Sequence, residues 1–264
     1  MRIAIAQIIS GADTAANLGI IRDYAAQAKN AGAQLVVFPE AAMRAFGHPL
    51  KDIAEPLDGP WASEVRRVAK DLDITIVAGM FTPGAEGRVR NTLLVTGPGV
   101  EASYDKVHLF DAFGFTESKT VDAGAAPVTF ELDGTVFGMA TCYDVRFPAL
   151  FTANANAGAH VNIVCASWGA GEGKADQWDL LVRARALDST TFVVACGQGD
   201  PETVGAGPAG SAPTGIGHSA VVTPLGTALV SLGGKPELAV VDIDPASVES
   251  VRATLPVLAN ARSF

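Results

Sequence analysis

Short apolar runs alternate with segments of helical apolar spacing along almost the whole chain. Runs rich in Val and Ile and bounded by turn residues are typical of strands that helices cover. The pattern predicts helices over 15–31, 61–72, 148–157, 176–188 and 246–252, the first with Asp13 or Thr14 as its N-cap. It predicts strands over 3–8, 34–38, 74–80, 91–96, 136–141, 160–166, 192–196, 218–223 and 238–243. This alternation indicates an α/β protein.

Two stretches of the chain depart from a strict alternation of strands and helices. The segments 91–141 and 218–243 hold successive strands with no helix between them. A mixed sheet, or two sheets packed face to face, therefore fits better than a purely parallel sheet. Nothing in the pattern calls for a second domain. We expect residues 1–264 to form one domain that ends, from about residue 250, in an arm across a neighbouring subunit.

A long loop-like segment and the apolar start of the chain also carry information. Residues 198–217 are rich in Gly, Pro and Thr, and structureless segments of this length are often lids or mobile parts of a site. We expect this one to border a site. The apolar start, 1–9, is too short for a membrane span and lacks a convincing signal-peptide cleavage site, so we expect a first strand rather than export or anchoring.

Composition and charge narrow the range of partners. The 264 residues are 48% hydrophobic and 18% charged, which is ordinary for a globular protein. A formal net charge of −9 argues against nucleic acid or an anionic membrane surface as the main partner. The three cysteines form no disulfide pattern, and the four histidines show no zinc-ligand spacing. We therefore expect a cytoplasmic protein that acts on a small molecule without a metal.

The candidate chemistry lies near the ends of apolar runs. One buried run stops at Cys142 just before a helix, whose dipole would favour a thiolate. Another run leads to Glu40, and Lys106 lies among apolar and aromatic neighbours. Each residue alone has an ordinary interpretation, as a small buried thiol, a capping carboxylate and a solvated cation. Their combination is what suggests a functional set.

These three residue types fit one reaction. A thiol that attacks a carbonyl or nitrile carbon needs a base, and the leaving group needs that proton back, so Glu40 suits both steps. The oxygen of the tetrahedral intermediate becomes negative and needs positioned donors. Lys106 and the backbone N–H of Tyr143, which follows Cys142, would supply them. The set therefore predicts nucleophilic catalysis by a thiol.

The chain resembles the nitrilase superfamily of carbon–nitrogen hydrolases over nearly its whole length. The family's motifs occur in order: Phe38-Pro39-Glu40, Tyr104-Asp105-Lys106-Val107-His108-Leu109-Phe110 and Thr141-Cys142-Tyr143-Asp144-Val145-Arg146-Phe147-Pro148. The resemblance implies a four-layer αββα sandwich with a Glu40, Lys106 and Cys142 triad. It places the family's second active-site glutamate, which orients the lysine and the substrate, on Glu117. It also implies homodimers or larger homo-oligomers, and no metal or organic cofactor.

The residues after the nucleophile bear on the substrate. The pattern Tyr-Asp-x-Arg-Phe-Pro is similar to that of the branch that holds ω-amidases and deaminated-glutathione amidases. We expect Asp144 and Arg146 to form a local ion pair that shapes the turn, with Arg146 also a candidate pocket residue. Trp168 lies where the resemblance implies a pocket wall. The stretch 166–169 reads Ala-Ser-Trp-Gly, whereas the ω-amidase branch usually has a Phe and then a loop with Thr-Gly-Pro.

The sequence thus predicts a thiol-dependent amidase that hydrolyses a small acid amide to the carboxylic acid and ammonia through a cysteine thioester. An N-carbamoyl-compound hydrolase or a nitrilase would use the same triad, because pocket shape decides which carbon–nitrogen bond fits. A catalytically silent binding protein is the alternative from another class. A lysine, a thiol and two carboxylates in one partly buried site are costly unless used, which favours the enzyme.

Overall fold

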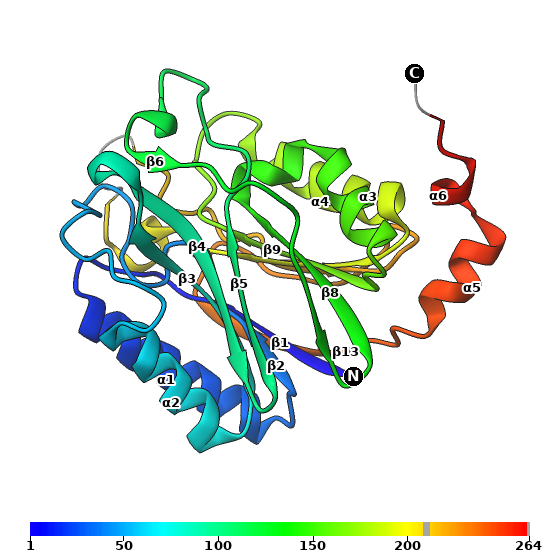
Figure 1. Cartoon of the computed structure of the whole chain (residues 1–264), viewed down its shortest axis with the longest axis horizontal. Helices are drawn as coiled ribbons and strands as arrows, with labels where there is room; N and C mark the ends of the chain where they lie inside the picture. The colour runs from blue at the N-terminus through cyan, green and yellow to red at the C-terminus, as the bar shows by residue number, and fades with distance from the viewer. Residues whose placement is uncertain (208–211, 263–264) are drawn as a thin grey trace.

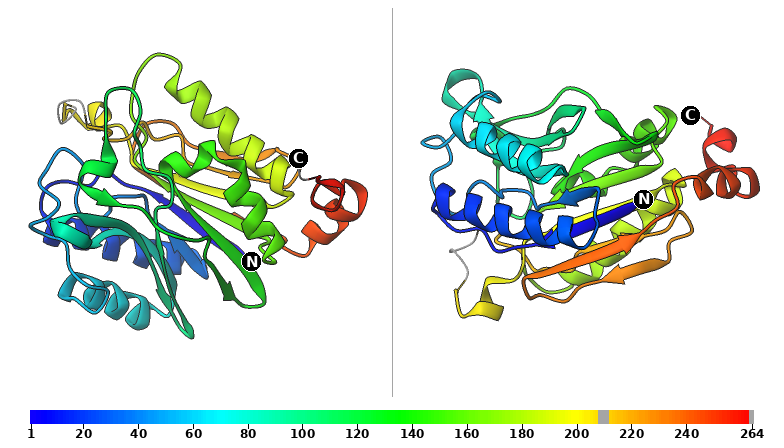
Figure 2. Two further views of the ribbon diagram at one scale, coloured as in Figure 1. Left: turned by 45° about the horizontal axis from the view of Figure 1, so that its top comes forward. Right: turned by 90° about the horizontal axis from the view of Figure 1, so that it is seen from below.

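The structure is a computed structural model that describes residues 1–207 and 212–262. Two β-sheets pack face to face, and helices cover the outer face of each sheet (Figure 1). Figure 2 shows the same four layers from two further directions. The mixed α/β class and the αββα order of layers expected from the sequence are confirmed.

The first sheet has seven strands in the order β13-β1-β2-β3-β4-β5, with β6 paired to β4. β1, β2 and β3 are parallel to one another, whereas β13, β4 and β5 pair antiparallel with their neighbours on this path. The strands are β1 (Arg2–Gln7), β2 (Leu35–Val37), β3 (Thr75–Pro83), β4 (Val89–Gly97), β5 (Val100–Asp105), β6 (Val121–Asp122) and β13 (Glu237–Asp242).

The second sheet has six strands in the order β12-β11-β10-β9-β8-β7. β8, β9 and β10 are parallel, and the other pairs are antiparallel. The strands are β7 (Thr129–Leu132), β8 (Thr135–Thr141), β9 (Val161–Ala166), β10 (Phe192–Gly197), β11 (Ala220–Val222) and β12 (Ala228–Ser231). Each sheet is therefore mixed, with a parallel centre and antiparallel edges.

The helices divide between the two outer faces. α1 (Thr14–Asn30) and α2 (Pro60–Leu72) cover the seven-stranded sheet, and α3 (Pro148–Asn156) and α4 (Lys174–Ser189) cover the other. α5 (Ser247–Thr254) and α6 (Val257–Asn260) extend away from the sheets (Figure 1). Short 3₁₀ turns are η1 (Ala85–Gly87), η2 (Glu117–Lys119), η3 (Cys142–Arg146) and η4 (Pro201–Val204). In the described ranges, no helix has the length and apolarity needed to cross a bilayer.

The alternation of side chains along a strand explains the two buried layers. Successive side chains of a strand point to opposite faces of its sheet. In β1, Ile3 and Ile5 join the cluster between the sheets, whereas Ala4 and Ala6 join the cluster beneath α1 and α2. Both faces of β1 are therefore buried, which is why the sequence shows a continuous apolar run there rather than an alternating one.

The sequence pattern did not predict four of the strands. β5, β6, β7 and β12 are short or partly exposed, so their apolar residues alternate with polar ones or are few. These strands lie at or near sheet edges, where only one face or neither face needs to be apolar. The predicted helices all exist, although α4 begins at Lys174 rather than Asp176.

Candidate active site

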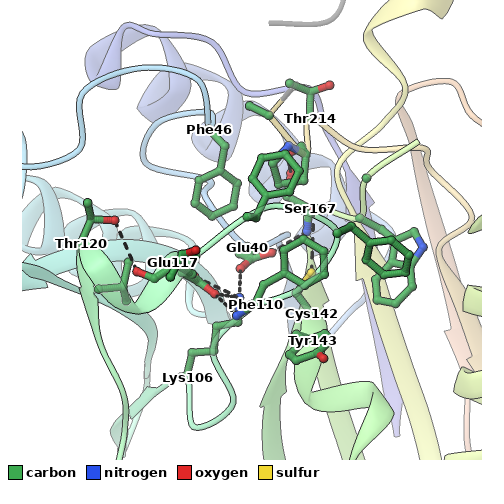
Figure 3. Close-up of a pocket in the computed structure, with 18 of the residues that line it drawn as sticks. Glu40, Phe46, Lys106, Phe110, Glu117, Thr120, Cys142, Tyr143, Ser167 and Thr214 are labelled. Carbon is green, nitrogen blue, oxygen red and sulfur yellow. Dashed lines mark hydrogen bonds and ion pairs between the residues drawn. The ribbon is translucent and has the colours of Figure 1, made fainter. Parts of the chain in front are cut away.

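The three residues proposed as a triad meet at one end of the sandwich, where the two sheets lie against each other. Glu40 follows β2 and Lys106 follows β5, both in the seven-stranded sheet. Cys142 follows β8 in the six-stranded sheet. Figure 3 shows these side chains converging on one pocket, together with Glu117. The site therefore depends on the packing of one sheet on the other.

Cys142 is the first residue of η3, directly after β8, and its backbone is strained. Its φ of 48° lies in the left-handed region, which non-glycine residues rarely adopt and which is often found at functional sites. The Cys142 thiol donates to the Ser167 carbonyl oxygen over 3.7 Å. Burial, and next the carboxylate of Glu40, raise the pKa of the Cys142 thiol well above its ordinary value. The Cys142 thiol thus holds its proton more tightly than an ordinary cysteine does, whereas the dipole of a helix start alone would favour a thiolate.

Glu40 is fully buried and held by three donors. Its Oε1 accepts from Asn91 Nδ2 at 2.7 Å and from Lys106 Nζ at 3.3 Å, and its Oε2 accepts from the Ser167 N–H at 2.7 Å. Burial raises the pKa of Glu40, Lys106 opposes that rise, and the nearby Glu117 adds to it. A carboxylate with a raised pKa that is fixed beside a thiol is suited to take a proton and return it.

Lys106 lies between two carboxylates. Its Nζ is 2.9 Å from Glu117 Oε2 as well as 3.3 Å from Glu40 Oε1. Burial lowers the pKa of Lys106, but the attraction of Glu40 and Glu117 outweighs this effect and raises it overall. Lys106 is therefore a permanent cation. Glu117 is fixed in turn by the Phe110 N–H, 2.6 Å from its Oε2, so the structure brings all four predicted side chains together.

Gly79 allows the Glu40 segment to lie directly on β3. A Cβ at residue 79 would come within 2.7 Å of the Ala41 nitrogen and 2.9 Å of the Glu40 Cα, closer than real Cβ atoms approach other atoms. The Met43 N–H donates to the Gly79 carbonyl at 2.9 Å. This close backbone approach fixes where Glu40 enters the site, and only glycine permits it.

The predicted ion pair between Asp144 and Arg146 is wrong. Asp144 instead links the turn of Cys142 to the end of β5. Its carboxylate accepts from the Tyr104 hydroxyl at 2.7 Å, the Thr141 N–H at 2.8 Å and the His108 N–H at 2.9 Å. Asp144 is buried and faces the first sheet. Arg146 points elsewhere and donates to the Gln177 side-chain oxygen at 2.7 Å.

A cavity of about 620 Å³ opens onto the four catalytic candidates. Most of its wall is aromatic or aliphatic, including Phe46, Leu50, Phe110, Phe113, Phe115 and Trp168. Trp168 thus lies in the wall, as expected, whereas Arg146 is absent from the lining and has its guanidinium over the Trp168 ring at 5.0 Å.

Tyr143 and the segment 198–217 also reach the pocket. Tyr143 lines it, and its N–H belongs to the first turn of η3, where backbone N–H groups have no acceptor within the helix. From the predicted border segment, Ala212, Pro213 and Thr214 line the cavity, whereas 208–211 lie outside the described residues. The Ser167 hydroxyl donates to the Pro213 carbonyl at 2.6 Å, which ties this segment to β9.

Several residues of the site could not be predicted from the sequence. Asn91 and the Ser167 N–H hold Glu40, and Lys174 contributes a cation to the pocket wall. None of them belongs to a motif that was identified, and contacts between distant segments bring them in. As to metals, no group of three or more His, Cys, Asp or Glu side chains placed to hold an ion was found in residues 1–207 and 212–262.

The sandwich fold and the cluster of thiol, lysine and carboxylates are those of a hydrolase of carbon–nitrogen bonds. A sequence model described as "Carbon-nitrogen hydrolase" matches residues 2–253. The chain therefore belongs to the carbon–nitrogen hydrolase family.

Two curated relatives support this assignment. A hydrolase of Mycobacterium tuberculosis is 54% identical over all of this chain and 96% of its own length. A deaminated glutathione amidase of Escherichia coli O157:H7 is 35% identical over 93% of this chain and 91% of its own length. The enzyme class, hydrolysis of carbon–nitrogen bonds, follows from the family and these relatives.

Solved structures of an amidase from Nesterenkonia sp. AN1, a nitrilase-superfamily protein, are similar to this fold. One has a TM-score of 0.80 and 30% identity, and the match covers 97% of this chain and 98% of that one. A variant of that amidase carries acrylamide added to its active-site cysteine, and another variant is in complex with butyramide. Members of this family thus include amidases with an active-site cysteine.

Proposed function

We propose that this protein is a thiol-dependent amidase that hydrolyses a small acid amide to the carboxylic acid and ammonia. The observation that carries the proposal is the position of Glu40. The Glu40 carboxylate accepts hydrogen bonds from Lys106 and from the Ser167 N–H. The carbonyl of the same Ser167 accepts from the Cys142 thiol. A base, a cation and a protonated nucleophile are therefore assembled around a single pocket.

In the first half of the reaction, Cys142 forms a bond to the amide carbon. Glu40 takes the thiol proton as the sulfur attacks, and the π electrons of the carbonyl move onto its oxygen. Lys106 Nζ makes three hydrogen bonds, one to Glu40 Oε1 and two to the oxygens of Glu117. Because two of them go to one carboxylate, Lys106 can turn one N–H to this oxyanion and still contact both partners. The Tyr143 N–H supplies a second donor. Both donors are fixed before the substrate arrives.

The tetrahedral intermediate then collapses and the carbon–nitrogen bond breaks. Glu40 returns its proton to the departing nitrogen, ammonia leaves, and a thioester remains on Cys142. Glu40, ionised again, takes a proton from water as the water oxygen attacks the thioester carbon. The carbon–sulfur bond breaks, the acid is released, and the proton passes to the Cys142 sulfur. A raised pKa suits Glu40 to both directions of proton transfer.

The pocket wall and a relative support the proposed substrate class, and the free thiol supports a compartment for the protein. The wall of Phe46, Phe110 and Trp168 suits a carbon chain rather than a highly polar molecule. The E. coli relative is named for an amidase that acts on deaminated glutathione, an acid, and this favours an acid amide here. We also propose the cytoplasm as the compartment, because a reducing environment keeps Cys142 a free thiol.

The test of this proposal is to trap the thioester. Incubation with slowly hydrolysed carboxamides, followed by intact-protein and peptide mass spectrometry, should show the acyl group on Cys142. Activity of Cys142→Ser should fall on the order of a thousandfold or more. Ammonia release measured across carboxamides, carbamoyl amino acids and nitriles should be fastest with the carboxamides.

Cys165 supplies the internal control for this experiment. It is a free thiol but is fully buried in β9, so it should stay unmodified, and Cys165→Ala should still form the adduct on Cys142. An adduct on another residue, or full activity of Cys142→Ser, would disprove the scheme. Faster turnover of nitriles or carbamoyl compounds would leave the nucleophile in place but replace the substrate class.

A further inference from the structure

Lys174 places a cation in the wall of the pocket, inside a group of aromatic rings. Its Nζ lies 3.9 Å from the ring centre of Phe113, 5.8 Å from that of Phe110 and 5.6 Å from that of Trp168. The Trp168 indole N–H donates to the Lys174 carbonyl at 2.9 Å, which fixes the backbone at the start of α4. The ammonium is therefore held at the cavity rather than extended into solvent.

This cation has no carboxylate partner among the residues that the structure describes. No salt bridge joins Lys174 to an Asp or Glu in the ranges 1–207 and 212–262. Burial lowers the pKa of Lys174, and the neighbouring Arg146 lowers it further. Arg146 also lies over the Trp168 ring, so two cations lie near this one aromatic side chain, of which only Lys174 lines the pocket. Aromatic faces stabilise such a cation only in part.

The catalytic end of the pocket carries an excess of negative charge instead. Glu40 and Glu117 carry two negative charges there, against the single positive charge of Lys106. A second carboxylate on the substrate would be repelled at that end and attracted to Lys174. The cavity also has many aromatic and aliphatic side chains in its wall, which suit the carbon chain of a ligand. The charge distribution of the cavity thus selects a molecule with an amide at one end and an anion at the other.

We propose that Lys174 is the specificity-determining residue of this pocket and binds the free carboxylate of a linear ω-carboxy amide. The carboxylate accepts charge-assisted hydrogen bonds from the Lys174 ammonium, and the methylene chain lies against Phe110 and Phe113. Arg146 acts through its charge, because it is absent from the pocket lining. This inference rests on the proposed amidase function and adds the chemical group that the pocket recognises.

The test compares each ω-carboxy amide with the neutral amide in which a methyl group replaces the carboxylate. The pairs are succinamate with butyramide, glutaramate with valeramide, and adipamate with hexanamide, which together sample the distance between the two ends. We expect kcat/KM to favour the charged member of the best-fitting pair. In Lys174→Met this preference should fall about tenfold to a hundredfold, as expected for a hydrogen bond to a charged group. Lys174→Arg should retain part of it.

Lys119→Met is the matched control, because it removes the same charge from an exposed lysine near Glu117 that is absent from the pocket lining. It should leave the preference unchanged. An equal preference in Lys174→Met and the unaltered protein would overturn the assignment, even if every amide is hydrolysed.

Binding separates this inference from the proposed reaction. Calorimetry with Cys142→Ala should detect the best ω-carboxy amide, and adding Lys174→Met should weaken its affinity by a similar factor. If the unaltered protein hydrolyses no amide but this binding difference persists, the reaction is wrong and the carboxylate subsite stands. If Cys142→Ala binds charged and neutral amides alike, the subsite is wrong.

Discussion

At the scale of single residues, Glu40 and Cys142 both keep their protons more tightly than usual. Burial raises both pKa values, the Glu40 carboxylate raises that of Cys142 further, and the Glu117 carboxylate adds to the rise in Glu40. In the proposed reaction, the resting pair therefore carries its one negative charge on Glu40, and the Cys142 thiol loses its proton only as the sulfur attacks the substrate. This arrangement avoids the need for a preformed thiolate in a buried site.

The pH dependence of kcat/KM follows from these two shifts. Activity needs Glu40 ionised and Cys142 protonated, so the rate falls as the pH drops through the pKa of Glu40 and again as it rises through that of Cys142. Because both values are raised, the acid limb should lie above the ordinary Glu value of 4.5 and the alkaline limb above 9.0. A pH series of kcat/KM with the best amide measures both limbs.

Glu40→Gln should lower kcat/KM by about a hundredfold to ten-thousandfold and remove the acid limb from the residual activity. Asp111→Asn is the control, since this carboxylate is exposed and bonds Ser118 rather than the triad. An acid limb that survives in Glu40→Gln would assign the base to another group.

The sequence predicted the residues that belong to motifs and missed those that do not. Glu40 and Cys142 follow apolar runs and Lys106 lies among apolar and aromatic neighbours, so all three could be chosen by chemistry, whereas Glu117 needed the family resemblance. Lys174 was missed because the periodic pattern placed the start of its helix at Asp176 and gave no sign that Phe113 lies beside it. The segment that carries Phe113 is positioned by tertiary contacts, which a single sequence does not display.

At the scale of elements, the site depends on how strands end. β2, β5 and β8 each deliver one catalytic candidate, and β9 delivers Ser167, which contacts two of them. Buried strands such as β2 and β8 can be predicted from the sequence because both of their faces are apolar. β5, which Lys106 directly follows, was missed because its exposed side is polar. The sequence thus located the reactive residue but not the strand that positions it.

Gly79→Ala tests whether β3 positions Glu40. The added methyl group would meet the Ala41 nitrogen and the Pro39 oxygen at 2.7 and 2.8 Å, both of them backbone atoms that have no rotamer to change. We expect the Glu40 segment to shift, with kcat falling at least about tenfold and the free energy of unfolding falling by about 1–3 kcal/mol. Urea unfolding and steady-state kinetics measure the two effects.

Gly19→Ala provides the matched control for this substitution. Gly19 lies within α1, and nothing lies within 4 Å of its added Cβ. Alanine should therefore stabilise the helix by up to about 1 kcal/mol and leave kcat unchanged. Normal kinetics in Gly79→Ala would mean that the Glu40 segment does not need the close approach to β3.

At the scale of the whole molecule, the active site exists only when the two sheets are in register with each other. Glu40 and Lys106 come from one sheet and Cys142 and Ser167 from the other. The helix-free segments left open a mixed sheet or two sheets packed face to face, and the family resemblance implied the sandwich. Contacts that align the two sheets include buried polar pairs far apart in the chain. Association into a homo-oligomer, with residues from about 250 as an arm, stays a prediction.

Gln7 is one such contact between the sheets. It ends β1 in the first sheet and is fully buried, and its Oε1 accepts from the Ser219 N–H at 3.0 Å and hydroxyl at 2.7 Å, just before β11 of the second sheet. Its Nε2 donates to the Gly233 carbonyl at 2.8 Å. Both ends of the amide are therefore used, and an apolar side chain of similar length would leave several buried groups without partners.

Gln7→Met should lower the free energy of unfolding by about 3 kcal/mol. The hydrogen-bond partners of Gln7 would stay buried without a partner, and nothing would then offset the cost of their desolvation. Ser219→Ala removes a single hydroxyl from the same contact and should cost only about 1 kcal/mol. Since neither side chain touches the triad, the limbs of the pH profile should keep their positions while kcat falls with the loosened alignment. Equal stability losses in the two variants would show that Gln7 contributes no more than one hydrogen bond. A shift of the acid limb in Gln7→Met would instead show that Gln7 affects the pKa of Glu40 directly.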